Sequence, residues 1–190
     1  MEKVSLGKNS MMFPMPLGLV GVNVVDNRPN FTTVGSIATA SLDPPMVSFS
    51  LNKVRYSNQF IKEKKVFSLN FPTINLTDKV DYCGLVSGEK VDKSKLFKVF
   101  YGKLSDAPMI NECPLCIECK LVAVVDLPKN EVFIGQIVDS FCEQKYLTNG
   151  KPDTAKLSLC TLNFGDSSYR APGVVVGKAF CDGVKLAPLN

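Results

Sequence analysis

A group of residues between positions 36 and 57 has side chains suited to holding a phosphate. The group consists of Ser36, Thr39, Ser50, Asn52, Arg55, Tyr56 and Ser57. The hydroxyls fall near the ends of two predicted strands, and the arginine stands where a helix is predicted to begin. Hydroxyl and backbone donors, a helix N-terminus and a planar guanidinium are the groups that bind phosphate oxygens. Serine and threonine are also common in ordinary strand and cap positions, and no fixed motif is present, so chemistry alone makes the phosphate site a hypothesis.

Histidine is absent from the chain, which limits the chemistry of its own side chains. Its absence excludes Ser-His-Asp and Cys-His catalysis, and it removes a histidine base and most zinc and non-haem iron sites. Asp26, Asp43 and Asp166 fall in predicted turns, and no two carboxylates are spaced as an acid–base pair. We therefore predict no catalytic side chain and expect any chemistry to come from a cofactor, a cysteine or a carboxylate.

Three of the seven cysteines have the CxxCxxC spacing of an iron–sulfur ligand set, at Cys113, Cys116 and Cys119. The segment from Cys116 onward reads as a strand, in which side chains three apart point to opposite faces. We therefore favour buried thiols over a metal site, with an iron–sulfur protein as an alternative. An odd number of cysteines and no recognisable signal peptide indicate reduced thiols and a cytoplasmic protein.

Composition favours one globular domain over residues 1–190, since 45% of the residues are hydrophobic and 21% are charged. The formal net charge of +4 is too small to indicate nucleic acid by itself. Basic residues gather at 62–65 and 90–98, where they form either solvated helix faces or a docking patch. No apolar run approaches the roughly 18 residues of a membrane span, so we expect no membrane partner.

Two common nucleotide-binding motifs are missing from the sequence. No GxGxxG follows a predicted strand, and no GxxxxGK[ST] is present. The sequence therefore predicts neither a Rossmann dinucleotide site nor a P-loop.

The elements that must position these residues are mostly strands. Apolar and β-branched runs predict strands at 17–25, 31–40, 46–51, 66–71, 116–127, 131–141, 159–163 and 174–180. Asp43-Pro44-Pro45 is predicted as a rigid turn, and residues 128–130 as a hairpin loop. Many strands of similar length with few short helices predict a mainly β, closed or nearly closed antiparallel barrel.

The predicted helices are short. Ser57 is expected to cap a helix that runs to Lys65, and Thr77 to cap one at 78–85. A further short helix is predicted at 93–100, and the polar stretch 145–157 is expected to be a surface loop.

Segments distributed along nearly the whole chain match a known family. They are NFTT at 30–33, SLDPPMV at 41–47, RYS at 55–57, FSLNFP at 67–72, DYCG at 81–84, SG at 87–88, IECK at 117–120, Tyr169 and GKAF at 177–180. In this order they resemble the flavin reductase-like, FMN-binding split-barrel family, in particular its flavoredoxin branch. The resemblance implies a Greek-key-like split β-barrel that forms a homodimer and binds FMN without a covalent bond.

The resemblance also implies cofactor-binding positions. They are Ser36, Ile37, Ala38, Thr39, Ser50, Leu51, Asn52, Lys53, Arg55, Tyr56, Ser57, Asn70, Phe71, Cys83 and Tyr169. Arg55 and Ser57 are expected at the phosphate, and a turn at Asn70-Phe71 beside the ring system. The flavin would supply the redox chemistry and the protein its orientation, so a missing histidine costs nothing.

Members of this family differ in their reaction. Some take hydride from NAD(P)H, and others keep FMN as non-enzymatic electron carriers between redox proteins. The basic segment at 62–65 could dock an acidic, ferredoxin-like donor, which favours the carrier. A basic barrel that binds nucleic acid is the remote alternative, because tryptophan is absent and the aromatic residues are scattered.

Overall fold

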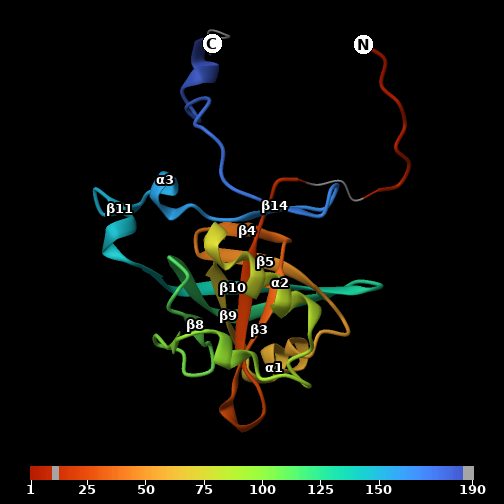
Figure 1. Cartoon of the computed structure of the whole chain (residues 1–190), viewed down its shortest axis with the longest axis vertical. Coiled ribbons are helices and arrows are strands. Elements are labelled where there is room, and N and C mark those ends of the chain that lie inside the picture. The colour runs from red at the N-terminus through yellow and green to blue at the C-terminus, as the bar shows by residue number, and fades with distance from the viewer. Residues whose placement is uncertain (10–12, 186–190) are drawn as a thin grey trace.

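The computed structural model describes residues 1–9 and 13–185, and its centre is a seven-stranded antiparallel sheet (Figure 1). The strand order is β3-β2-β6-β9-β10-β5-β4. The strands are β2 (Gly18–Asn23), β3 (Pro29–Val34), β4 (Ile37–Leu42), β5 (Pro45–Asn52), β6 (Val66–Phe71), β9 (Leu115–Asp126) and β10 (Asn130–Cys142). Together with its few short helices, this is the mainly β split-barrel fold that the sequence predicts.

The connection between β3 and β4 explains why the sheet curls. These strands occupy opposite edges of the sheet, yet only Gly35 and Ser36 separate them in the chain. A flat sheet would put its edges roughly 30 Å apart, whereas the link spans at most about 11 Å. The sheet must therefore roll up. No ladder joins β3 to β4 in the described ranges, so the barrel remains split there.

This geometry corrects the single strand predicted at 31–40, which is two strands broken at Gly35. The apolar pattern runs through the break, so it gave no sign of a change of sheet edge. A Cβ on Gly35 would lie 2.8 Å from Leu162 Cδ2, so a larger residue in this link would require that side chain to shift.

Both predicted helix caps are wrong. α1 (Ser57–Lys64) and α2 (Thr77–Leu85) begin where expected, but neither has a side-chain cap bond. The Ser57 hydroxyl instead accepts a hydrogen bond from Asn30 Nδ2 at 2.9 Å. Thr77 Oγ1 donates at 3.4 Å to the Ile74 carbonyl, because the short 3-10 helix η2 (Ile74–Leu76) precedes α2.

Three other predictions also need correction. The helix at 93–100 is a 3-10 turn, η3 (Lys93–Leu96), followed by a short ladder of β7 (Val99–Phe100) with β8 (Met109–Ile110). The expected loop at 145–157 folds into η4 (Gln144–Tyr146), the ribbon of β11 (Leu147–Thr148) and β12 (Lys151–Pro152), and α3 (Thr154–Leu157). Residues 174–180 form no strand, because no neighbouring strand pairs with them there.

Smaller elements complete the described chain. The 3-10 helix η1 (Val25–Asn27) joins β2 to β3, and η5 (Asp182–Lys185) lies near the C-terminal end. A separate three-stranded sheet contains, in this order, β1 (Met15–Pro16), β13 (Thr161–Asn163) and β14 (Ser168–Arg170). In Figure 1 both ends of the chain extend from this side of the molecule, away from the barrel.

Two apolar clusters lie on the two sides of the sheet. The barrel core contains Phe49, which stacks on Phe133 at 5.2 Å between ring centroids and meets Phe67 edge-on at 5.0 Å. The flank core lies under α2 and η3 and contains Phe31 and Cys83. No helix in residues 1–9 and 13–185 is long and apolar enough to cross a membrane.

The cysteines of the CxxCxxC segment divide between these clusters. Cys113 and Cys116 belong to the flank core, and Cys119 to the barrel core. The alternation of side chains along β9 therefore prevents the three sulfurs from converging, as the strand argument predicted. Among the described residues, no group of three or more cysteines or carboxylates is placed to hold a metal ion.

Candidate functional site

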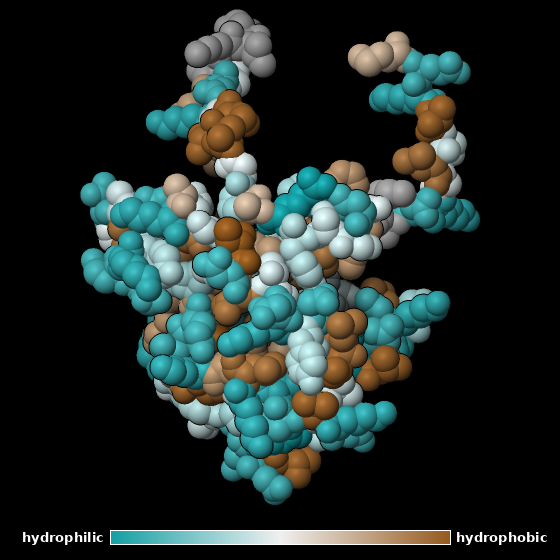
Figure 2. Space-filling view, in the orientation of Figure 1, coloured by the Kyte–Doolittle hydropathy of each residue, from teal (hydrophilic) through white to brown (hydrophobic). Residues whose placement is uncertain are grey.

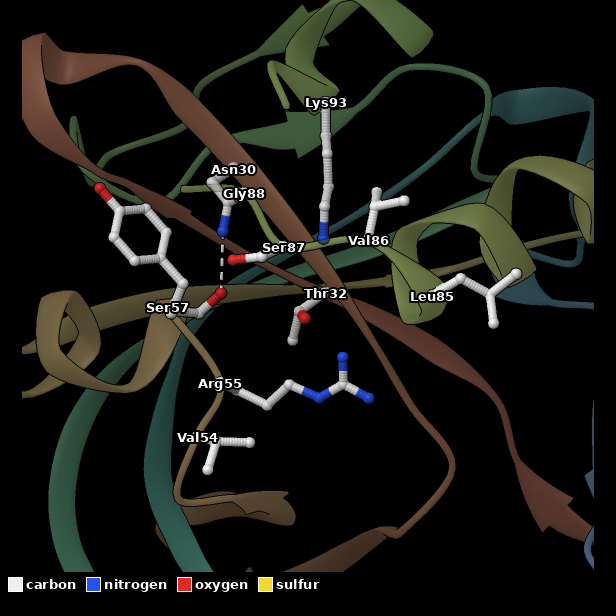
Figure 3. Close-up of a pocket in the computed structure, with 11 residues that line it drawn as sticks. Asn30, Thr32, Val54, Arg55, Ser57, Leu85, Val86, Ser87, Gly88 and Lys93 are labelled. Atoms are coloured by element: carbon white, nitrogen blue, oxygen red, sulfur yellow. Dashed lines mark hydrogen bonds between the residues drawn. The ribbon is translucent and has the colours of Figure 1, made fainter. Parts of the chain in front are cut away.

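A polar cavity of about 190 Å³ opens between the start of α1 and the end of α2 (Figure 3). It is lined by Asn30, Thr32, Val54, Arg55, Tyr56, Ser57, Leu85, Val86, Ser87, Gly88 and Lys93. The lining comes from β3, the turn between β5 and α1, the segment after α2, and η3. Segments far apart in the sequence therefore meet at one place.

The charge of this cavity is one-sided. Its lining contains the cations Arg55 and Lys93 and no aspartate or glutamate. Figure 3 shows the two side chains reaching toward each other from opposite sides. Because no carboxylate in the lining balances these two positive charges, the cavity fits a ligand with concentrated negative charge.

Lys93 is the more deeply buried of the two cations, with 1% of its surface exposed. Its Nζ donates to the Phe31 carbonyl at 3.0 Å and to the Cys83 carbonyl at 2.8 Å. Burial lowers the pKa of Lys93 to about 8, an effect opposed by Cys83 and reinforced by the positive charge of Arg55. The carbonyl partners satisfy hydrogen bonds without neutralising the ammonium, so the lysine remains ready for an anion.

Arg55 is fixed by the backbone of the opposite wall. One guanidinium nitrogen, NH1, donates to the Gly84 carbonyl at 2.7 Å. This bond joins the residue ahead of α1 to the last turn of α2. It holds the guanidinium at the cavity while its remaining N–H groups are oriented for a ligand.

Asn30 and Ser57 form the polar end of the cavity. Asn30 is 1% exposed, and its Nδ2 donates to Ser57 Oγ. Since that oxygen acts as the acceptor, the Ser57 hydroxyl proton is left to donate to a ligand. Gly88 packs directly against the amide, where a Cβ would lie 1.9 Å from Asn30 Oδ1.

The structure brings three of the residues implied by the resemblance, Arg55, Tyr56 and Ser57, together at this cavity. Ser36 and Ser50 form a separate pair, in which Ser36 Oγ donates to the Ser50 carbonyl at 3.0 Å and accepts from the Ser50 N–H at 3.1 Å.

The residues around this pair divide between the two faces of the barrel wall. On the paired strands β4 and β5, Ala38 and Thr39 are exposed, whereas Ile37 and Leu51 are buried in the barrel core.

The remaining implied positions lie outside the cavity lining. Asn52 Oδ1 accepts from the Val54 N–H at 3.2 Å, and Lys53 pairs with Asp126. The expected turn at Asn70-Phe71 is wrong, because both residues belong to β6.

Asn70 and Phe71 are committed to the fold around them. Asn70 is fully buried, with its Nδ2 donating to the Leu19 carbonyl at 3.0 Å and its Oδ1 accepting from the Ile110 N–H at 2.8 Å. Phe71 is half-buried against the barrel core. The side-chain amide of Asn70 therefore already uses the polar atoms that a ligand would need.

Cys83 is a residue of α2, and Tyr169 of β14 contacts the same helix. Cys83 is fully buried, and burial raises its pKa to about 11 despite the nearby Lys93, so this thiol is not activated. The Tyr169 hydroxyl donates to Asp81 Oδ1 at 2.7 Å and ties β14 to α2. Burial, followed by the Asp81 carboxylate, raises the pKa of Tyr169.

Sequence reasoning missed Lys93, Asn30 and Gly88 as parts of the cavity. In the sequence, Lys93 is one of a basic cluster at 90–98, where a solvated lysine is the ordinary expectation. Asn30 and Gly88 occur in the segments that carry the resemblance, which was the one available signal. Only the packing of η3 against β3 reveals that this particular lysine points inward.

Comparison with known proteins agrees with the fold described above. Residues 10–171 match the model of the flavin reductase like domain. The structure resembles flavoredoxin from Methanosarcina acetivorans, with a TM-score of 0.95 and 42% identity, covering 98% of this chain and 100% of that one. Flavoredoxin of Desulfovibrio vulgaris (Miyazaki F) has a TM-score of 0.90 and 32% identity, and the match covers 96% of this chain and 100% of that one. An FMN-binding protein from Thermus thermophilus has a TM-score of 0.76 and 25% identity, and the match covers 90% of this chain and 94% of that one.

Proposed function

Because the chain belongs to the flavin reductase-like family, we propose that it binds FMN non-covalently, with the phosphate held by Arg55, Lys93 and Ser57. The observation that carries the proposal is a cavity containing two cations and no carboxylate. A phosphate monoester has a charge near −2 and three strong acceptor oxygens. It therefore complements the ammonium, the guanidinium and the hydroxyl together.

The size of the cavity favours FMN over a dinucleotide flavin. A volume of about 190 Å³ accommodates a terminal phosphate. Lys93 and Asn30 in its lining are each 1% exposed, so we propose that the cavity takes a terminal phosphate and not an attached adenylate. FMN-binding proteins among the structural relatives support the same choice.

The chain's own residues bind and orient the cofactor. When bound, FMN supplies the electron-transfer chemistry. We place the ring system at Ala38 and Thr39, which are exposed on β4 just after the Ser36–Ser50 pair. Polar backbone there would favour a reduced, anionic ring.

We propose that the electron donor is either NAD(P)H or an acidic redox protein. The basic face of α1 supports the protein donor, because Lys62 and Lys65 are exposed there. Lys62 also pairs with Glu131 at 2.7 Å, which reduces the net charge of that face. A nicotinamide donor would make the protein a flavin-dependent oxidoreductase, and a protein donor would make it an electron carrier.

We further propose a homodimer. The outer half of β9 exposes Val122 and Val125, at 53% and 46%, and Leu127 follows them at 42%. The two ends of the chain that extend from the molecule form an N-terminal and a C-terminal arm. The C-terminal arm exposes Val174, Val175 and Val176, and apolar side chains are visible along both arms in Figure 2. Exposed apolar surface of this kind marks interaction sites, and a second copy is the partner that the family implies.

An anaerobic visible spectrum of the purified protein, before and after adding NADH and NADPH, tests the proposed function. A flavin spectrum bleached by either nucleotide identifies a reductase. A flavin spectrum bleached only by dithionite identifies a carrier that takes electrons from a protein. Absence of flavin absorption even after FMN is added back contradicts the proposal.

A further inference from the structure

The amine of Lys93 has the surroundings of a nucleophile. Nζ donates to two carbonyls, Phe31 O and Cys83 O. A neutral lysine amine has two N–H groups, so these acceptors can use both of them and leave the lone pair unused. Lys93 lines the cavity that also contains Arg55 and Ser57. Desolvation beside another cation is a recognised way to activate a lysine.

We propose that Lys93 is a covalent modification site that takes the acyl group of an acyl phosphate. Arg55 and Ser57 would hold the phosphate of the reagent, which places the adjoining carbonyl carbon next to the Lys93 amine. This inference shares with the proposed function only the affinity of the cavity for phosphate. It does not require that FMN be the ligand.

The reaction balances without an oxidant or a metal. The neutral amine attacks the acyl carbon, a C–N bond forms, and the bond between the acyl carbon and the phosphate oxygen breaks. The departing phosphate takes the electron pair of that bond and accepts the proton that the nitrogen loses. The products are an Nζ-acyl-lysine and hydrogen phosphate.

Other lysines of the same segment lack this combination. Lys90 and Lys95 are exposed and do not line the cavity. At pH 7.5 about a quarter of an amine with a pKa near 8 is neutral, compared with about 0.1% of an ordinary lysine. The lowered pKa of Lys93 therefore adds to the positioning that the cavity provides.

Acylation would block the cavity. The amide removes one of the two cations and places the acyl carbons in a space of about 190 Å³. A phosphate ligand would then meet both a weaker field and a steric obstacle. The modification would thus act as a switch on phosphate binding.

The test treats the full-length protein with acetyl phosphate at pH 7.5 and follows Lys93, Lys90 and Lys95 by peptide mass spectrometry. We expect Lys93 to be acetylated at least tenfold faster than either exposed lysine, and 50 mM inorganic phosphate to remove that advantage. The N-hydroxysuccinimide ester of acetic acid, which has no phosphate, should lack the phosphate-sensitive advantage. Equal rates at the three lysines would overturn the proposal.

Two variants sharpen the result. Arg55→Met should slow acetylation of Lys93 to the rate of Lys90, and Lys93→Arg should leave no modified residue in the cavity. Protection by inorganic phosphate needs no variant, so the test survives if Arg55→Met fails to fold. Protection by phosphate but not by FMN would leave this inference standing and contradict the proposed function. FMN binding without selective acetylation would support the proposed function and overturn this inference.

Discussion

Arg55 and Lys93 are both cations of one cavity, but the fold holds them differently. Arg55 is half-buried and is anchored by one carbonyl, that of Gly84. Lys93 is fully buried and is anchored by two carbonyls. Arginine remains charged throughout the accessible pH range, whereas a buried lysine titrates. The two residues should therefore contribute to phosphate binding with different pH dependence.

Replacing Arg55 by alanine removes a charge-assisted contact to the proposed phosphate. Such contacts are worth about 1.5–3 kcal/mol, so we expect the FMN dissociation constant to rise roughly ten- to a hundredfold. Fluorescence titration of FMN measures the change. Lys98→Ala is the matched control, since Lys98 is exposed and outside the cavity lining. An unchanged dissociation constant in Arg55→Ala would argue against its phosphate role.

Lys93 predicts a pH dependence with a definite sign. The ammonium strengthens phosphate binding and its pKa is lowered to about 8, so FMN affinity should fall above pH 8, by up to about tenfold per pH unit. In the FMN-free chain the sign for folding is opposite. Between pH 8 and 10.5 the unfolded chain binds more protons at this residue, so the contribution of Lys93 to stability rises with pH.

FMN titrations from pH 6.5 to 9.5 check this dependence. Lys93→Met serves as the reference, because it lacks the amine but keeps a long side chain in the cavity. A wild-type slope above pH 8 that persists in Lys93→Met would assign the titration to another group.

Hydrogen bonds around α2 join the lining of the cavity to neighbouring elements, and we call this set of bonds the connector. Thr33 Oγ1 donates to the Val80 carbonyl and joins β3 to α2. Arg28 NH2 donates at 2.8 Å to the carbonyl of Gly88, just beyond the helix. These bonds leave the turn after α2 little freedom to move away from β3. The shape of the cavity therefore depends on side-chain-to-backbone bonds between elements.

Gly88→Ala tests this connector. The new Cβ would lie 1.9 Å from Asn30 Oδ1 and 2.6 Å from Asn30 Cγ, so the buried amide would have to leave Ser57. Overpacking of this kind costs about 1–3 kcal/mol. We expect a lower urea midpoint together with weaker FMN binding. Gly173→Ala, where a Cβ would meet nothing within 4 Å, should change neither quantity. A stable Gly88→Ala protein with normal FMN affinity would contradict the role given to this contact.

At the scale of the whole molecule, the core of the barrel is well packed, but apolar side chains remain exposed outside it. The barrel core fills the space between the curled strands with aromatic contacts. Outside it, the arms and the outer half of β9 expose apolar side chains to solvent. The two arms leave the same side of the molecule, which allows a single partner to cover them (Figure 1).

The proposed homodimer predicts a solution mass of twice the 20.8 kDa chain. Light scattering after size-exclusion chromatography measures it directly. Val122→Lys and Val125→Lys together place charges on the exposed half of β9 and should increase the monomer fraction at least tenfold. Leu42→Lys, another exposed apolar position outside β9 and outside the cavity lining, is the control for added charge. A monomeric wild-type protein at micromolar concentration would exclude this assembly.

The sequence alone predicted most strands of the seven-stranded sheet, the hairpin between β9 and β10, and the family, because these follow from local periodicity, turn residues and short motifs. It also predicted Arg55 and Ser57 for the phosphate, and the structure places both residues at one cavity. Tertiary structure decided the rest. It broke one predicted strand where the barrel turns from edge to edge, and it diverted the Ser57 hydroxyl from capping to Asn30. It also turned Lys93 inward to two carbonyls, since contacts across distant segments carry no local pattern that a sequence could display.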